Sequence, residues 1–210
     1  MIRCPIYACN RLAGCRMCKQ LRRYCPDKGL KIMGTYRRSN QDLIDTIKRL
    51  KNLDISVCLV TDKEIPRELL WELASSPQNV LQINFCMIQK PINSDWVIEM
   101  IHLAETCGIK CNLILFPILP SLVTTVDIIK IIDGIRNCGH CTVYLKFGEL
   151  KLNSFKCLEG NLLLSKKVIP IKYLDKLNGY LWRCNSLYTE EFFQTVKFYT
   201  DNSNMLLYSI

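Results

Sequence analysis

Short, continuously apolar runs alternate with longer amphipathic segments along most of this chain. The apolar runs occupy residues 2–8, 30–34, 54–61, 79–87, 109–116 and 141–147. Runs of this length, bounded by turn residues, are typical of strands that are buried on both faces. The segments between them repeat their apolar side chains with a period of about 3.6 residues, which predicts helices. The order of these patterns favours a parallel sheet covered by helices.

The predicted helices have recognisable starts. These starts are Ser39, Pro66, Ser94 and Thr124. Ser and Thr side chains accept hydrogen bonds from the free N–H groups of a first helical turn, and Pro is tolerated there. Thr124 and Asp127 have the spacing of a capping box, which predicts a helix over 125–137. Gly108 is suited to end the helix that begins at Ser94.

The alternation of predicted strands and helices becomes less regular after residue 150, which suggests a division of the chain at this point. Residues 1–150 are expected to form an α/β domain, either a partial barrel or an open doubly wound sheet. Residues 151–210 are expected to form a small, mostly helical appendage packed on it. Its helices are predicted near 171–184 and near 189–199, the second capped by Thr189. In either architecture, ligands bind at the carboxyl ends of the strands.

Composition and short motifs limit the class of protein to which this domain can belong. A chain of 210 residues suits one domain with a small appendage. The longest apolar runs, 113–119 and 126–135, are too short or too interrupted by charge to span a bilayer, so no membrane association is expected. The first residues lack the apolar segment of a secretion signal, and we expect a cytoplasmic protein. No P-loop, GxGxxG motif or Ser-His-Asp set is present.

The net charge of +9 is concentrated at one end of the chain. Residues 1–51 hold 13 of the 28 Lys and Arg but 3 of the 19 Asp and Glu, a local net charge of +10. The other 159 residues together have a net charge of −1. A field of this sign attracts anionic groups, such as phosphates, carboxylates or an anionic cofactor.

Three of the thirteen cysteines, Cys9, Cys15 and Cys18, follow the first predicted strand within ten residues. Iron–sulfur clusters are held by cysteine thiolates that one short loop supplies. Nearby basic residues such as Arg16 and Lys19 would lower the pKa of these thiols. Three ligands would leave one iron open to a substrate or cofactor.

Two other interpretations of the cysteines stay open. Cys4 or Cys25 could complete a site with four cysteines, holding zinc or a closed cluster. A zinc site needs two close pairs, and the second pair in the chain is Cys138 and Cys141, with His140 between them. The cysteines could also be free thiols without a ligand.

Several stretches, together with the cysteine loop, resemble the radical S-adenosylmethionine (SAM) superfamily over roughly residues 2–150. The most similar branch is that of spore photoproduct lyase. The stretches are SVCLVTDKEIPRELLWEL, NVLQINFCM, AETCGIKCNLILFPILPSL and VYLKFGEL, which begin at residues 56, 79, 104 and 143. The cysteine spacing here is CxxxxxCxxC, where the superfamily commonly has CxxxCxxC. The resemblance favours a partial (β/α)6 TIM-like barrel.

The resemblance also implies a site. Cys9, Cys15 and Cys18 would bind a [4Fe–4S] cluster, whose remaining iron would bind the amino and carboxylate groups of SAM. Lys63 and Asn84 fall where the family places contacts to SAM, and Lys146 ends the sixth strand at the same edge. Reductive cleavage of SAM would give a 5′-deoxyadenosyl radical that takes a hydrogen atom from the substrate. A flavodoxin or ferredoxin would be the electron donor.

Two functions therefore follow from the sequence. The first is a radical SAM enzyme acting on an anionic substrate, with nucleic acid or a nucleotide as first candidate because of the basic N-terminal quarter. The second is a non-enzymatic scaffold or nucleic-acid-binding protein. In that protein the barrel would be degenerate and the cysteines would bind zinc or no metal.

Overall fold

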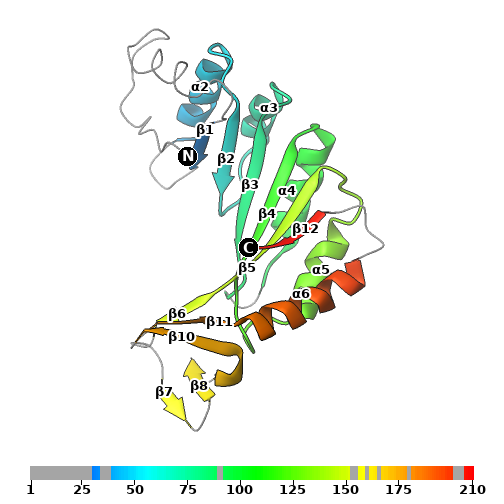
Figure 1. Cartoon of the computed structure of the whole chain (residues 1–210). Helices are drawn as coiled ribbons and strands as arrows, with labels where there is room; N and C mark the ends of the chain where they lie inside the picture. The colour runs from blue at the N-terminus through cyan, green and yellow to red at the C-terminus, as the bar shows by residue number, and fades with distance from the viewer. Residues whose placement is uncertain are drawn as a thin grey trace.

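The computed structural model describes residues 30–33, 39–88, 92–151, 156–158, 161–164, 167–178, 181–200 and 206–210. A six-stranded sheet in the order β1-β2-β3-β4-β5-β12 is its frame (Figure 1). Its strands are β1 (Leu30–Met33), β2 (Val57–Thr61), β3 (Val80–Cys86), β4 (Lys110–Ile118), β5 (Cys141–Phe147) and β12 (Leu206–Ser209). Every neighbouring pair is parallel, as the apolar runs predict. The predicted strand 2–8 lies outside the described residues.

Four helices connect strands β1 to β5 and pack against one face of the sheet (Figure 1). They are α2 (Asn40–Lys51), α3 (Arg67–Ala74), α4 (Asp95–Thr106) and α5 (Thr125–Gly134). Strand residues on this face, such as Leu59, Ile83 and Leu113, are completely buried among the helices. Parallel strands joined by helices in this way confirm the predicted α/β partial barrel.

The helix starts show why local sequence predicted them well. Ser39 and Thr124 each form a capping box, in which the hydroxyl accepts from a backbone N–H three residues on. Ser94 does not cap α4 with its side chain; instead Asn93 Oδ1 accepts from the Asp95 N–H at 3.2 Å. The helix predicted over 125–137 ends earlier, at Gly134, because turns occupy the residues that lead into β5.

The appendage differs from the prediction, and the helix expected over 171–184 is wrong. These residues form a 3-10 turn (Ile171–Tyr173) followed by β10 (Leu174–Asn178) and β11 (Leu181–Cys184). The two strands join β6 (Glu149–Lys151) in an antiparallel sheet. A further antiparallel sheet contains β7 (Lys156–Leu158), β8 (Asn161–Leu164) and β9 (Lys167–Pro170). Hydrogen bonds to β6 stabilise the extended conformation of this segment, and the segment could not form them as an isolated helix.

The last helix, α6 (Ser186–Thr200), is longer than the predicted 189–199. Asn185 caps it in place of Thr189, because Asn185 Oδ1 accepts from the Tyr188 N–H at 3.0 Å. The chain then returns to the main sheet as β12 beside β5 (Figure 1). The rings of Tyr188 and Phe192 meet Phe147 of β5 edge to face, so α6 is anchored on the barrel. The boundary at residue 150 stays a prediction.

Candidate functional site

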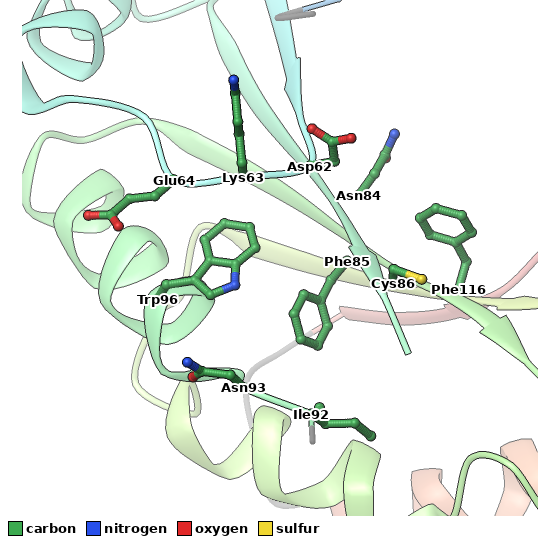
Figure 2. A pocket seen from close by; sticks show the side chains of 10 residues that line it. All are labelled: Asp62, Lys63, Glu64, Asn84, Phe85, Cys86, Ile92, Asn93, Trp96 and Phe116. Carbon is green, nitrogen blue, oxygen red and sulfur yellow. The ribbon is translucent and has the colours of Figure 1, made fainter. Parts of the chain in front are cut away.

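A cavity of about 540 Å³ opens at the carboxyl ends of β2, β3 and β4 (Figure 2). Its wall is built from the loop after β2, the last residues of β3, the segment that leads into α4, and Phe116 of β4. This edge is where parallel α/β folds bind their ligands, because loops that diverge from neighbouring strands leave a hollow there. The volume lies within the range of about 300–1,000 Å³ that is common for small-molecule sites.

The loop after β2 contributes three consecutive charged side chains, those of Asp62, Lys63 and Glu64. Thr61, the last residue of β2, is 2% exposed and holds this loop. Its hydroxyl donates to the Lys63 carbonyl at 2.6 Å and accepts from the Lys63 N–H at 3.2 Å. A buried threonine therefore fixes the backbone from which Lys63 projects at the cavity rim.

Strand β3 contributes an amide pair. Asn84 is half-buried and lines the cavity, whereas Gln82 is 8% exposed and lies deeper on the same face of the strand. The Gln82 Nε2 donates to Asn84 Oδ1 at 2.7 Å. This contact holds the Asn84 amide in one orientation at the mouth of the sheet.

The opposite wall is apolar. Phe85 and Trp96 pack edge to face, with ring centroids 5.9 Å apart and an interplanar angle of 64°. Ile92 extends this surface, whereas Phe116 projects from the other face of the sheet, on the side of Cys86 (Figure 2). The cavity thus combines apolar side chains with a polar rim that carries both positive and negative charges, an arrangement that suits a ligand with an aromatic ring and ionised groups.

The structure brings together two of the predicted site residues. Lys63 and Asn84 line the same cavity, although 21 positions separate them in the sequence. Lys146 is exposed near the end of β5, two strands away from β3, and is not part of the cavity wall. Cys9, Cys15 and Cys18 lie outside the described residues. Whether any of these residues binds a cofactor stays a prediction.

Sequence reasoning missed the other residues of the cavity wall, Asp62 and Trp96 among them, and it missed Gln82 behind Asn84. A polar residue directly after an apolar strand is a usable signal, and Asp62 has it. Gln82 and Trp96 carry no such signal. Trp96 reaches the cavity because α4 starts beside the end of β3, which the topology decides.

A second group of chemically active side chains lies at the opposite edge of the sheet, where β4 and β5 begin. His102 Nε2 lies 2.8 Å from the Gly134 carbonyl, which can only accept, so this nitrogen carries the proton. In neutral His102, Nδ1 then accepts from the Cys138 thiol at 3.4 Å. His140 Nδ1 lies 3.1 Å from Glu105 Oε1. These contacts tie α4 to the turn before β5.

This second group of side chains does not support the alternative of a zinc site. Among the described residues, no three or more His, Cys, Asp or Glu side chains are arranged to hold a metal ion. Burial, with smaller contributions from the nearby Cys138 and Glu105, raises the pKa of Cys141 to about 12. Burial likewise raises the pKa of Cys111. Buried, protonated thiols of this kind behave as small apolar side chains.

Membrane insertion by a helix finds no support in the described part of the chain. None of its helices combines the length and the apolar character that crossing a bilayer requires.

Comparison with known proteins identifies relatives by structure alone. No family model and no curated protein sequence matches this chain. SuiB of Streptococcus suis matches with a TM-score of 0.57 and 14% identity, over 91% of this chain and 42% of SuiB. A spore photoproduct lyase mutant with dinucleoside spore photoproduct matches with a TM-score of 0.58 and 10% identity, over 92% of this chain and 65% of the lyase. Another lyase mutant, with bound AdoMet and the same dinucleoside, gives 0.56 and 11%.

These matched structures are radical SAM enzymes, and this chain spans less than two thirds of the length of each. At such low identity the likeness establishes the fold. The resemblance to the spore photoproduct lyase branch that the sequence carries is thus confirmed at the level of structure.

Proposed function

We propose that this chain is a radical SAM enzyme whose cavity beside β2 and β3 binds SAM. The observation that carries this proposal is the meeting of Lys63 and Asn84 in one cavity at the carboxyl edge of the sheet. Both residues are also the SAM contacts that the sequence resemblance implies. Structural neighbours of the same fold are radical SAM enzymes, and one was solved with AdoMet bound.

The residues of the cavity suit the groups of SAM. The amide nitrogen of Asn84 and the ammonium of Lys63 donate hydrogen bonds, which the carboxylate and hydroxyl oxygens of SAM accept. The Asp62 and Glu64 carboxylates accept from amine and hydroxyl groups. The Trp96 and Phe116 side chains supply apolar surface for an adenine ring.

A [4Fe–4S] cluster and SAM would supply the radical chemistry when bound, in the form of a 5′-deoxyadenosyl radical. Cys9, Cys15 and Cys18 are the residues that would hold the cluster. The residues that the structure describes would have a different role. Asn84 and Lys63 orient the ligand, and the aromatic side chains exclude water from the place where a reactive species would form.

The substrate and the electron donor are further parts of this proposal. The local net charge of +10 over residues 1–51 supports an anionic substrate, with nucleic acid or a nucleotide first. Binding to DNA or RNA should then weaken steeply as salt is added. Absence of binding even at low salt would contradict the nucleic-acid part and leave the SAM site untouched. A flavodoxin or ferredoxin is proposed as the electron donor.

Equilibrium dialysis with labelled SAM tests the cavity directly. We expect the wild-type protein to bind SAM and Asn84→Ala to bind it about tenfold more weakly, because one hydrogen bond to an ionised or hydroxyl group is lost. Asn112→Ala is the matched control. Asn112 lies on β4, on the same face of the sheet and outside the cavity wall, and its variant should bind as the wild type does. Equal binding by Asn84→Ala and wild type would refute the assignment of the cavity.

A further inference from the structure

The side chain of Gln82 is almost completely buried next to the cavity. Gln82 is 8% exposed and forms no part of the cavity wall. It shares its face of β3 with Asn84, two residues further along the strand. In the register of the sheet it lies between Val60 of β2 and Asn112 of β4. Its Nε2 donates to Asn84 Oδ1 at 2.7 Å.

This one hydrogen bond decides what Asn84 presents to the cavity. A side-chain amide has an accepting oxygen and a donating nitrogen on the same carbon, and rotation by half a turn exchanges them. The Gln82 donor engages the oxygen from the deeper side, so the nitrogen of Asn84 faces outward, as Figure 2 shows for its amide. Burial of Gln82 shields the bond from water, which strengthens it.

We propose that Gln82 is a positioning residue that fixes the polarity of Asn84, so that this point of the cavity selects a ligand atom that accepts hydrogen bonds. Carboxylate oxygens, hydroxyl oxygens and unprotonated ring nitrogens belong to this class. The identity of the ligand as SAM rests on the proposed function. The orientation of Asn84 is a property of the chain alone.

A change of one functional group on Gln82 should reverse the selection. Gln82→Glu keeps the size of the side chain, but an ionised carboxylate can only accept. Asn84 would then turn its nitrogen to Glu and present its oxygen to the ligand. At alkaline pH, where the new carboxyl group is ionised, we expect SAM to bind about tenfold more weakly. Asn84→Asp, which removes the donor itself, should weaken binding by a similar factor.

Two further variants separate positioning from packing and from charge. Gln82→Met fills the same space without a donor, so Asn84 becomes free to rotate and the loss should be smaller than that of Gln82→Glu. Thr142→Asp places a carboxylate on the same face of the sheet but two strands from Gln82, beyond hydrogen-bond reach of its amide, and should leave SAM binding unchanged. Binding by Gln82→Glu as tight as that of the wild type would overturn the proposal.

A second readout needs no ligand. In protein labelled with ¹⁵N-asparagine, the side-chain amide signals of Asn84 are those that Asn84→Asp removes. In Gln82→Glu at alkaline pH, one of these protons should shift downfield and exchange more slowly with water, because it becomes bonded to a carboxylate. Identical Asn84 signals in Gln82→Glu and wild type would refute the positioning role. Failure of the wild type to bind SAM would instead refute the proposed function, and the amide signals would still decide the orientation of Asn84.

Discussion

Gly148 lies at the junction between β5 and β6, where the chain leaves the barrel sheet, and it has no room for a side chain. A Cβ atom added there would lie 2.7 Å from Leu119 Cδ2 and 2.7 Å from Pro117 Cβ. Non-bonded carbon atoms prefer separations of about 3.5–4.0 Å. The backbone cannot move aside freely, because the Gly148 N–H donates to the Ile118 carbonyl at 2.9 Å and its carbonyl accepts from the Cys184 N–H at 3.3 Å.

Gly148→Ala should therefore lower the free energy of unfolding by about 1–3 kcal/mol, the usual cost of overfilling a packed site. For a chain of this size, each kcal/mol corresponds to a fall of about 2–4 °C in Tm. Urea denaturation followed by circular dichroism measures the change, with the slope m expected to stay the same.

Gly139→Ala is the control for this experiment. A Cβ at Gly139 meets no atom within 4 Å, so the substitution should be neutral or raise stability by up to about 1 kcal/mol. Equal stability of Gly148→Ala and wild type would show that Leu119 and Pro117 yield without cost, and the reasoning from the close contacts would be refuted.

Three other predictions concern buried polar groups. Asn79 is 2% exposed, accepts from the Val57 N–H at 2.7 Å and donates to the Leu73 carbonyl at 2.8 Å. Asn79→Ala would leave these two backbone groups unpaired and should lower the free energy of unfolding by about 2–4 kcal/mol, as measured by urea denaturation. Burial raises the pKa of Cys141 from 9.0 to about 12. As pH rises, Cys141 therefore loses its proton at a lower pH in the unfolded protein than in the folded one. The contribution of this thiol to the free energy of unfolding should be complete below about pH 9 and should fall above it, by up to about 1.4 kcal/mol per pH unit. Cys141→Ala should reduce this slope, and an unchanged slope would contradict the assignment. In the folded protein near neutral pH, iodoacetamide should leave Cys141 unmodified by mass spectrometry, and rapid alkylation would show that its thiol is accessible.

Much of the fold could be predicted because its signals are local. The strand expected over 109–116 is observed as β4, and Ser39 and Thr124 form the capping boxes that their neighbours suggested. Continuous apolar runs predict buried parallel strands irrespective of their partners. Capping depends on residues within one helical turn, so a short window contains the necessary information.

The appendage could not be predicted in the same way. Ile171, Leu174 and Leu177 recur every three residues, a spacing that favours a helix over the alternation of a strand. The dipeptide Asn178-Gly179 is typical of hairpin turns and is the signal that favours two strands. Pairing of β11 with β6 decides between the alternatives, and such a long-range contact is invisible in a local pattern.

The candidate site could also be predicted only in part. Lys63 and Asn84 follow from a resemblance that fixes their positions relative to the strands. Their meeting in one cavity, the wall formed by Trp96, and the bond from Gln82 depend on how β3, α4 and the loop after β2 come together. Those relations arise from packing, which the sequence pattern does not specify.

Formation of 5′-deoxyadenosine is the decisive measurement for the proposed radical SAM activity. Protein reconstituted with iron and sulfide without oxygen would be reduced with dithionite and given SAM. We expect the wild type to form 5′-deoxyadenosine, Cys15→Ala and Cys18→Ala to form none, and Cys58→Ala, changed on β2 away from the cavity wall, to match the wild type. A wild-type protein that holds an iron–sulfur cluster yet forms no 5′-deoxyadenosine, or a Cys15→Ala variant that forms as much as the wild type, would contradict it.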